Sequence, residues 1–253
     1  MNAPRFYCQE ALAPAAVLEL PAPVARHAVR VLRLGIGAAL FVFDGQGGQY
    51  PARLLRIEKD RVWVELGAWQ EIECESPLDI TLVQALQAGE KMDFTVQKAV
   101  ELGVTTIVPV ESRRSVLKLA GERAAKRVAH WQGVAVAACE QCGRNRVPRV
   151  APLQRLAHWL AQPASDTLRL VLAPQATLSL HALPRQRKIE LLIGAEGGLD
   201  PQEMRAAQQA GFQAVSLGPR VLRTETAGLA ALAALQTLWG DWGGATSSGE
   251  GNV

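Results

Sequence analysis

The sequence predicts an α/β protein with a small β-rich unit at its N-terminus and a larger second domain built on a parallel sheet. In residues 1–72, short segments with polar and apolar alternation are separated by glycine turns, as in antiparallel strands. After residue 73, short apolar runs alternate with helical patterns, as in a buried parallel sheet. With 253 residues, 49% of them hydrophobic, the chain is long enough for two unequal domains with real cores.

Three segments of the N-terminal unit have strand character. Leu40–Phe43 is an apolar run that ends at the turn signal Asp44-Gly45, and Tyr50–Leu55 resumes an extended pattern. Arg61–Leu66 alternates polar and apolar residues, as a half-buried strand should. A short helix is expected over Ala25–Leu34. Short strands joined by glycine turns in so small a unit favour a barrel.

The second domain is expected to span residues 73–242, and its start lies within the acidic linker Glu71–Pro77. Its predicted strands are Asp79–Leu86, Thr105–Val110, Arg169–Ala173, Ile189–Ile193 and Ala214–Leu217, and its predicted helices are Met92–Leu102, a long helix with Ala124, Val128, Trp131, Ala135 and Ala138 on one face, and Glu225–Trp239. The Gly- and Ser-rich tail, residues 243–253, is expected to be disordered.

Composition excludes some classes of protein and permits others. A formal net charge of +3 permits an RNA partner without demanding one. No run reaches the roughly 20 apolar residues of a membrane span, and the N-terminus lacks a signal-peptide layout, so a cytoplasmic protein without a membrane partner is expected. Cys139 and Cys142 form a C-x-x-C, but a zinc site would need two more paired ligands. Buried thiols are the favoured interpretation, and no metal is expected.

The segment Ile193–Glu203 is the most informative stretch. An apolar strand runs directly into Gly194, Gly197 and Gly198, which allow a sharp turn and a close backbone approach to a ligand. Asp200 then stands where an N-cap belongs, ahead of a proline and a capping-box glutamate. Ligands bind at such carboxyl ends of strands in open α/β sheets, but an ordinary strand–helix connection explains this segment equally well. The spacing is not that of a dinucleotide fingerprint.

A second loop follows the strand expected at Ala214–Leu217. It contains Gly218-Pro219 and two arginines, Arg220 and Arg223, and Thr224 is the expected N-cap of the last helix. A guanidinium can steady a phosphate or an electron-rich oxygen of a base. The alternative is a solvated loop with incidental arginines, and two such loops after successive strands weaken that alternative.

Weaker signals lie elsewhere. The basic segment Cys139–Pro148 could contact RNA, although favourable charge at a helix C-terminus explains it better. Lys98 and Glu101 are three residues apart, and an ordinary surface ion pair would explain them. His27 lies in a basic context, yet an ordinary surface histidine is commoner.

Together these segments resemble the bacterial 16S ribosomal RNA uracil-N3 methyltransferases of the RsmE type, which belong to the SPOUT superfamily. Ala195 replaces the family's usual proline, and Cys142 replaces the usual serine. The matching pieces span nearly the whole chain, and they are Arg5-Phe6-Tyr7, His27 through Arg33, Asp44-Gly45 through Tyr50, Gln97-Lys98-Ala99 with Glu101 through Val104, Glu140-Gln141 with Gly143-Arg144, Ile193-Gly194 with Glu196-Gly197-Gly198, and Leu217-Gly218 with Arg220 through Ala227.

The resemblance implies a PUA-like N-terminal barrel that binds RNA and a SPOUT α/β domain whose last segment threads a trefoil knot. It also implies a homodimer that methylates N3 of a specific uracil in 16S ribosomal RNA of the small subunit, with S-adenosylmethionine as the methyl donor. The cofactor pocket would then be framed by Leu172, Ala173, Ile193, Gly194, Glu196, Gly197, Gly198, Leu217, Gly218, Leu222, Arg223 and Thr224.

For catalysis, the matching motifs place Arg223 and Arg5 as candidates to stabilise charge on the uracil oxygens. Glu225 is either a base or a residue that orients Arg223. Expected RNA contacts are Arg5, Arg26, His27, Arg30, Arg33, Lys98, Arg144, Arg146 and Arg220. The rival interpretations are another SPOUT RNA methyltransferase, acting on a ribose 2′-hydroxyl or another base, a non-catalytic RNA-binding protein, and a phosphate-binding protein.

Overall fold

The computed structural model describes residues 3–163 and 166–243, and these fall into two compact units. Unit 1 comprises the chain up to Glu75 together with Val136–Val147. Unit 2 comprises Ser76–Ala135 and the chain from Pro148 onward. The boundary expected between residues 72 and 73 stays a prediction, and the tail predicted to be disordered lies, apart from Gly243, outside the described residues.

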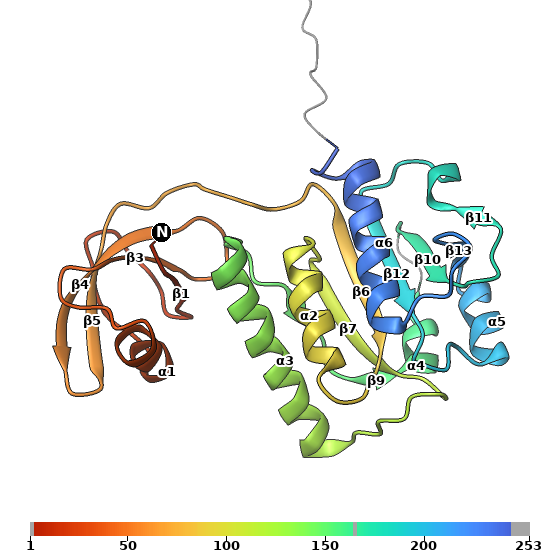
Figure 1. Cartoon of the computed structure of the whole chain (residues 1–253), viewed down its shortest axis with the longest axis horizontal. Helices are drawn as coiled ribbons and strands as arrows, with labels where there is room; N and C mark the ends of the chain where they lie inside the picture. Colours follow the sequence, from red (N-terminus) through yellow and green to blue (C-terminus); the bar gives the residue numbers. More distant parts are fainter. Residues whose placement is uncertain (1–2, 164–165, 244–253) are drawn as a thin grey trace, which may run out of the picture. The chain divides into compact units, whose positions relative to one another are not determined.

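Unit 1 is built on a sheet in which β1 runs parallel to β3 and the other neighbours are antiparallel (Figure 1). A short helix, α1, continues into a π-helical turn, His27–Val31, where one helix had been expected. Pro23 stands in the first turn of α1, where a proline ring suits the helical backbone. In the order β1-β3-β4-β5-β2 with α1, the elements are Arg5–Tyr7, Ala39–Phe43, Tyr50–Glu58, Arg61–Leu66, Val17–Glu19 and Ala22–Arg26.

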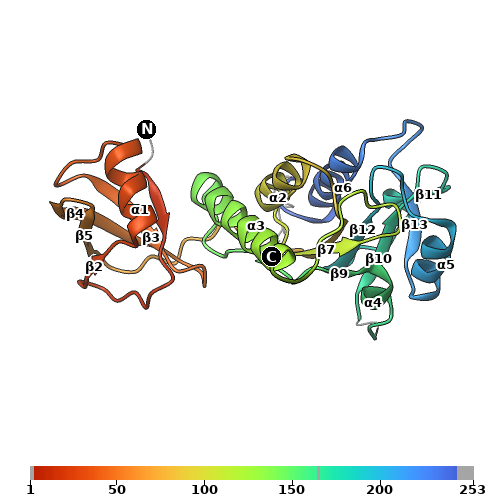
Figure 2. The same ribbon diagram turned by 90° about the horizontal axis from the view of Figure 1, so that it is seen from below.

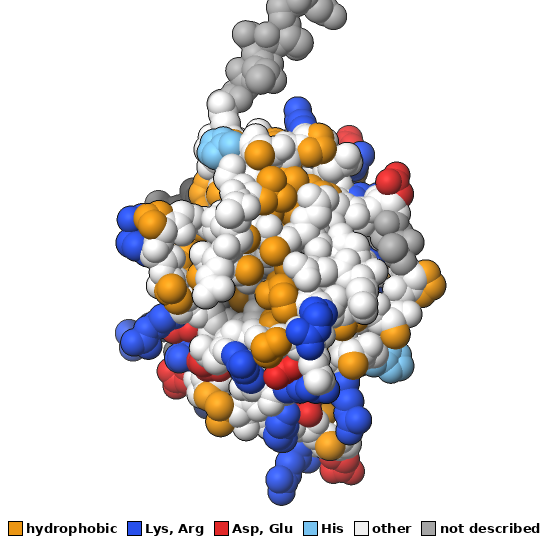
Figure 3. All heavy atoms as spheres, turned by 90° about the vertical axis from the view of Figure 1, so that its right-hand side faces the viewer, with side chains coloured by type: hydrophobic (Ala, Val, Ile, Leu, Met, Phe, Trp, Pro, Cys, Tyr) orange, Lys and Arg blue, Asp and Glu red, His pale blue; other side chains and the backbone are white. Residues whose placement is uncertain are grey.

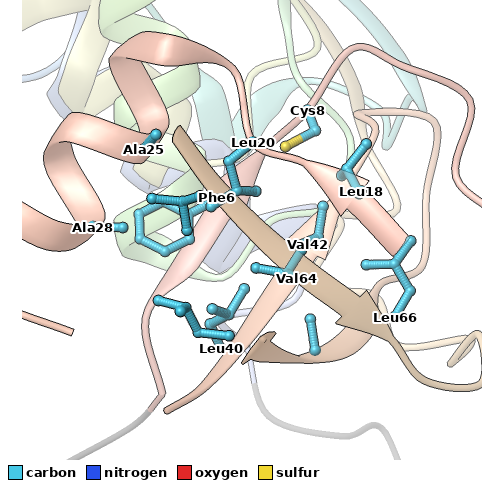
Figure 4. Packing of buried hydrophobic residues seen from close by; sticks show 13 residues of the cluster. Phe6, Cys8, Leu18, Leu20, Ala25, Ala28, Leu40, Val42, Val64 and Leu66 are labelled. Atoms are coloured by element: carbon cyan, nitrogen blue, oxygen red, sulfur yellow. The ribbon is translucent and has the colours of Figure 1, made fainter. Parts of the chain in front are cut away.

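The core of unit 1 forms where the inward-facing residues of these strands meet the apolar face of α1. Figure 4 shows the ring of Phe6 beside Ala25 and Ala28, with Leu40 and Val42 on the opposite side. All five side chains are at most 2% exposed, and each large one contributes roughly 1.5–3 kcal/mol by leaving water. The strand β1 was not expected from the sequence, because three residues show no periodicity.

Unit 2 contains a sheet whose paired strands are all parallel, as the apolar runs predict. The later strand β12 lies between β10 and β6. The order is β11-β13-β10-β12-β6-β7-β8, with the bounds Leu178–Ser179, Gln213–Ser216, Leu168–Leu172, Lys188–Ile193, Asp79–Ala85, Thr106–Glu111 and Arg149–Val150, and β9, Gln154–Arg155, pairs with β7.

Helices cover both faces of this sheet, as Figures 1 and 2 show. On one face, Leu156 of α4 and Ala207 of α5 pack in the same cluster as Val83 and Leu192. On the other face, α6 packs against α2 and β12. The α/β fold class predicted from the sequence is therefore confirmed. The helices are α2, Lys91–Glu101; α3, Gly121–Cys142; α4, Leu156–Leu160; α5, Pro201–Gln209; and α6, Thr224–Trp239.

Candidate active site

Three neighbouring strands, β13, β10 and β12, end at the same edge of the parallel sheet. A cleft lies between the turns that follow β10 and β13, and most of its lining is apolar. Figure 3 views the side of the molecule with β11, β13 and α5 and shows hydrophobic side chains grouped in the middle of that face. The cleft is lined by Leu172, Ala173, Pro174, Val215, Ser216, Leu217, Gly218, Arg220 and Leu222.

The cleft thus brings together five of the residues expected to hold a cofactor: Leu172, Ala173, Leu217, Gly218 and Leu222. The turn after β12 is not part of its lining. Gly218 has a φ of +105°, a backbone conformation that favours glycine, and open space lies where a Cβ would stand. A side chain there would be strained and would project beside the cleft.

The glycine turn after β12, residues 194–198, is compact. The Gly198 amide donates to the Ala195 carbonyl at 2.8 Å, and Gly198 has a φ of +70°. A Cβ on Gly194 would stand 3.0 Å from the backbone of Gly198 and Leu199, closer than ordinary van der Waals contact, so a side chain there would force the turn to shift. Asp200 caps α5, because its side chain accepts a hydrogen bond from the Gln202 amide. The Asp200 amide in turn donates to the Glu203 carboxylate. The predicted capping box is confirmed.

A hydrogen bond joins the glycine turn to the loop that follows β13. The Thr224 hydroxyl donates to the Gly194 carbonyl at 2.6 Å. The expectation that Thr224 caps the last helix is therefore wrong. Arg223 occupies the N-cap position without a side-chain bond, because the Thr224 hydroxyl is engaged across the sheet edge. The two glycine-bearing turns are adjacent and held together.

The side chains of Arg220 and Arg223 are exposed at this edge. Within the part of the chain that the structure describes, no ion pair or side-chain hydrogen bond engages the Arg223 guanidinium. Glu225 faces Lys91 rather than Arg223: Lys91 Nζ lies 3.7 Å from Glu225 Oε1 and 3.5 Å from Glu196 Oε1. Lys91 therefore links the carboxylates of both turns. The interpretation of Glu225 as the orienter of Arg223 finds no support in this arrangement.

A loop after β7 also contacts the glycine turn. Arg114 Nη1 donates to the Gly197 carbonyl at 2.6 Å, and the Arg113 amide donates to Glu203 Oε1 at 2.8 Å. Sequence reasoning missed Arg113 and Arg114, because no local pattern in Ser112–Ser115 indicates a contact with a turn more than 80 residues away. A clue was available in that the loop follows a strand of the same parallel sheet.

A larger groove, of about 470 Å³, borders this loop, but its charges are mostly paired. Lys118 lies 3.2 Å from Glu111 and Arg113 lies 3.4 Å from Asp200. Lys118 and Arg113 are thus already paired with carboxylates, whereas Arg223, beside the smaller cleft, has no partner among the described residues. The smaller cleft is the better candidate for chemistry.

Comparisons with known proteins identify the family of this chain. Residues 74–236 match the family described as an RNA methyltransferase domain. This chain belongs to that family. Residues 20–67 also match an RNA methyltransferase PUA domain. The resemblance derived from the sequence is confirmed, and most of the matched methyltransferase domain of this RNA methyltransferase lies in unit 2.

Relatives with assigned names support the same family. The chain is 34% identical over 239 residues to the ribosomal RNA small subunit methyltransferase E of Buchnera aphidicola subsp. Schizaphis graminum, covering 94% of this chain and 97% of the relative. The Bacillus subtilis protein of the same name is 32% identical, covering 83% and 85%.

Solved structures extend the likeness. The methyltransferase E of Neisseria gonorrhoeae, bound to S-adenosylmethionine, is 45% identical with a TM-score of 0.91 and covers 95% of this chain and 100% of its own. A methyltransferase of Legionella pneumophila, in complex with the same cofactor, is 37% identical with a TM-score of 0.91 and the same coverage.

In unit 1 of this RNA methyltransferase, Arg5 lies in a polar cluster. Its guanidinium donates to Gln49 Oε1 and Asn145 Oδ1 and reaches the Arg144 carbonyl at 3.4 Å, and it lies 5.1 Å from the ring of Phe43. These contacts engage most of its donors inside unit 1. These contacts support a structural role for Arg5, and the catalytic and RNA-binding roles expected for it stay predictions.

Arg144 is buried as well, with a side chain that is 4% exposed and paired with Glu75 through several hydrogen bonds. A guanidinium so enclosed is placed to hold the end of α3 in unit 1 rather than to meet RNA. Arg146, also expected at the RNA, is exposed and lies 3.5 Å from Glu73.

The remaining expected RNA contacts are accessible. Arg26, His27 and Arg33 are exposed along α1 and the turn that follows it, and Arg30 is exposed beside Asp60. In unit 2, Lys98 pairs with Glu101 at 2.7 Å, as its spacing allows.

The cysteines show no metal-site geometry. Cys139 is buried and Cys142 is half-buried, and burial raises the pKa of the Cys8 and Cys139 thiols to about 12. Within residues 3–163 and 166–243, no group of three or more His, Cys, Asp or Glu side chains could hold a metal ion. In the same described part of the chain, the structure has no helix of the length and apolar character that crossing a membrane requires.

Proposed function

We propose that this chain transfers a methyl group from S-adenosylmethionine to N3 of a specific uracil in 16S ribosomal RNA of the small subunit. The observation that supports it most is the Thr224–Gly194 hydrogen bond, which places two glycine-bearing turns side by side next to an apolar cleft and next to Arg223, an arginine with no partner among the described residues. Relatives that cover most of this chain are named ribosomal RNA small subunit methyltransferases, and two similar structures contain S-adenosylmethionine.

The cleft fits the cofactor's adenosine part. Leu172, Leu217 and Leu222 offer apolar surface for a flat base, and the turns around them present backbone groups for hydrogen bonds. Open space at the Cβ positions of Gly198 and Gly218 lets a ligand come close to the peptide groups. We expect Ile193, Gly194, Glu196 and Gly197 to complete the pocket from the adjacent strand. The cofactor supplies an electrophilic methyl group on a sulfonium.

The chain's own task is to activate the nucleophile and align it. Uracil N3 carries a proton, and once that proton leaves, negative charge spreads to the two flanking carbonyl oxygens. The free Arg223 guanidinium would stabilise this charge as it develops. Glu225 is the candidate acceptor of the proton, and Lys91 Nζ lies 3.7 Å from its Oε1, where it can hold the carboxylate in place.

Binding of the ribosomal RNA is assigned chiefly to unit 1. The exposed cations Arg26, Arg30 and Arg33, with His27, form a basic edge suited to phosphates. Arg220 borders the cleft and can meet the RNA near the reacting base, and Lys98 and Arg146 are further candidates.

Three coarser expectations belong to the same proposal. The insertion of β12 between β10 and β6 supports a trefoil knot. Exposed hydrophobic side chains in unit 2, among them Phe94 and Val221, support a homodimer. A substrate in the ribosome implies a cytoplasmic location.

The experiment is methylation with labelled S-adenosylmethionine of small ribosomal subunits that lack the modification, followed by mass spectrometry of digested RNA. Label at N3 of a single uracil is the expected result, and subunits that already carry the methyl group are the control. Label on a ribose 2′-hydroxyl or another base would replace this function with that of another SPOUT enzyme. Cofactor binding without any label on RNA or subunits would remove the proposal.

A further inference from the structure

A fully buried glutamine lies beneath the active site. Gln84 is in the interior strand β6, is 0% exposed, and pairs in register with Ile193, the last residue of β12 before the glycine turn. Most of its neighbours in the strand are apolar. Burying an amide in such surroundings is costly unless its hydrogen bonds are satisfied, so its presence calls for a specific use.

The partners of Gln84 fix the direction of a chain of hydrogen bonds. Its Nε2 donates to the Ala85 carbonyl at 3.1 Å and to the Thr224 hydroxyl at 3.2 Å. Because a carbonyl can only accept, the atom facing Ala85 must be the nitrogen. The Thr224 oxygen therefore accepts a hydrogen bond from Gln84. Its own hydroxyl hydrogen is left to donate to the Gly194 carbonyl, 2.6 Å away.

A second glutamine, Gln87, binds Glu225, which follows Thr224 in α6. With its amide oriented so that both polar atoms find partners, Gln87 donates to the Thr95 hydroxyl at 2.9 Å and to the Lys91 carbonyl at 3.2 Å. Its oxygen accepts from the Glu225 amide at 3.1 Å. Gln84 near the end of β6 and Gln87 just after that strand thus bind Thr224 and Glu225, the two residues that directly follow Arg223.

We propose that Gln84 is a positioning residue for methyl transfer. By committing the Thr224 hydroxyl to Gly194, it locks the glycine turn of the cofactor pocket to the start of α6, where Arg223 stands. Because a peptide unit is planar, holding the Gly194 carbonyl also fixes the orientation of the Gly194–Ala195 peptide. The inference rests on the proposed function, since it assigns Gln84 to the same pocket.

The test compares Gln84→Leu, which keeps side-chain volume and removes the amide, with the matched variant Gln236→Leu. Gln236 is equally buried, at 1% exposed, on α6 itself, but it bonds to Ser76 and to the Leu102 carbonyl, away from the cleft. Calorimetry measures the dissociation constant for S-adenosylmethionine, and single-turnover assays measure the methylation rate.

We expect Gln84→Leu to raise the dissociation constant about tenfold, the effect of losing one buried hydrogen bond, and to slow turnover. Gln236→Leu should lower the melting temperature but leave affinity and rate at wild-type values. Thr224→Val should match Gln84→Leu, the double variant should be no worse than either, and Thr224→Ser should rescue most of the loss.

Gln84→Leu with wild-type affinity and rate would overturn the inference while leaving the proposed function intact. So would an equal loss of affinity in Gln236→Leu, because general loosening of the fold would then explain both. If Gln84→Leu does not fold, the Thr224→Val and Thr224→Ser pair decides: equal affinities in these two variants refute the role of the hydroxyl. A wild-type protein that neither binds the cofactor nor methylates RNA would refute the proposed function itself.

Discussion

The Thr224 hydroxyl lies 2.6 Å from the Gly194 carbonyl and donates to it. This hydrogen bond holds together two turns that are 30 residues apart in sequence. The bond connects the carboxyl end of β12 to the first residue of α6. It leaves Arg223, one residue earlier, exposed and without an ion-pair partner in the described chain. A rigid pair of turns beneath a free guanidinium is the arrangement that an in-line transfer to a charged base needs.

Replacing Arg223 with alanine should slow methylation by about 10²–10³-fold, the cost of removing one donor aimed at developing negative charge. Cofactor affinity should survive, because the Arg223 side chain has no bond to either turn. Single-turnover assays and calorimetry measure the two effects separately. Arg205→Ala, which removes an exposed arginine from α5, is the control. A normal rate in Arg223→Ala would remove this arginine from the mechanism.

Replacing Gly198 with valine should abolish measurable binding of S-adenosylmethionine. The side chain would occupy the open space beside the glycine turn, and the φ of +70° would add strain of about 1–2 kcal/mol. Gly211→Val is a matched control, since Gly211 has a φ of +88° and open space at its Cβ but follows α5 away from the cleft. Calorimetry should show lost binding only for Gly198→Val, and equal affinity in both variants would mean that the pocket has been misplaced.

Much of this fold was accessible from local pattern. The strand Arg61–Leu66 and the capping box at Asp200 were predicted to the residue, because alternation and cap chemistry are written in neighbouring positions. The short strands β1 and β2, three residues each, have too few residues to show a period. They exist because β3 and β5 offer them free edges.

The candidate site was accessible only in part, for a similar reason. Glycines after two apolar strands announce turns, so Gly198 and Gly218 were found. Gln84, Thr224 and Arg114 act through partners more than 80 positions away or across a strand, and Thr224 resembles a helix cap in local sequence. Arg144 was expected at RNA because a sequence shows charge and does not show burial, and the structure buries it beside Glu75. Arg5 is half-buried among polar contacts that the sequence did not indicate, and its expected roles stay predictions.

The cysteines should differ sharply in reactivity. Burial raises the pKa of Cys8 and Cys139 to about 12, so almost no thiolate forms at pH 8, whereas Cys74 is exposed. A thiol reagent such as Ellman's should react quickly with Cys74 and reach Cys8 and Cys139 only after denaturation. The fast phase should disappear in Cys74→Ser. Rapid modification of Cys8 or Cys139 in that variant, without denaturant, would show that the cores around these two thiols are open.

Stability should depend on pH through Glu140, which accepts from the Tyr7 amide at 2.9 Å in unit 1. Burial raises the pKa of this carboxyl, and the Tyr7 hydrogen bond opposes the shift without cancelling it. A raised folded-state pKa means that ionisation costs stability: the benefit of the neutral acid is complete below the ordinary pKa of 4.5 and is lost as pH rises through the shifted value.

Glu140→Gln keeps an oxygen for the Tyr7 amide and removes the charge. The variant should therefore melt at a higher temperature than the wild type at pH 7, and the difference should shrink as pH falls below 4.5. Glu71→Gln, which removes an exposed carboxylate from the same unit, should leave the melting temperature unchanged at both pH values. Scanning calorimetry of the full chain provides the comparison, and a Glu140→Gln variant that is less stable than the wild type at pH 7 would show that the ionised carboxylate is favoured by its surroundings.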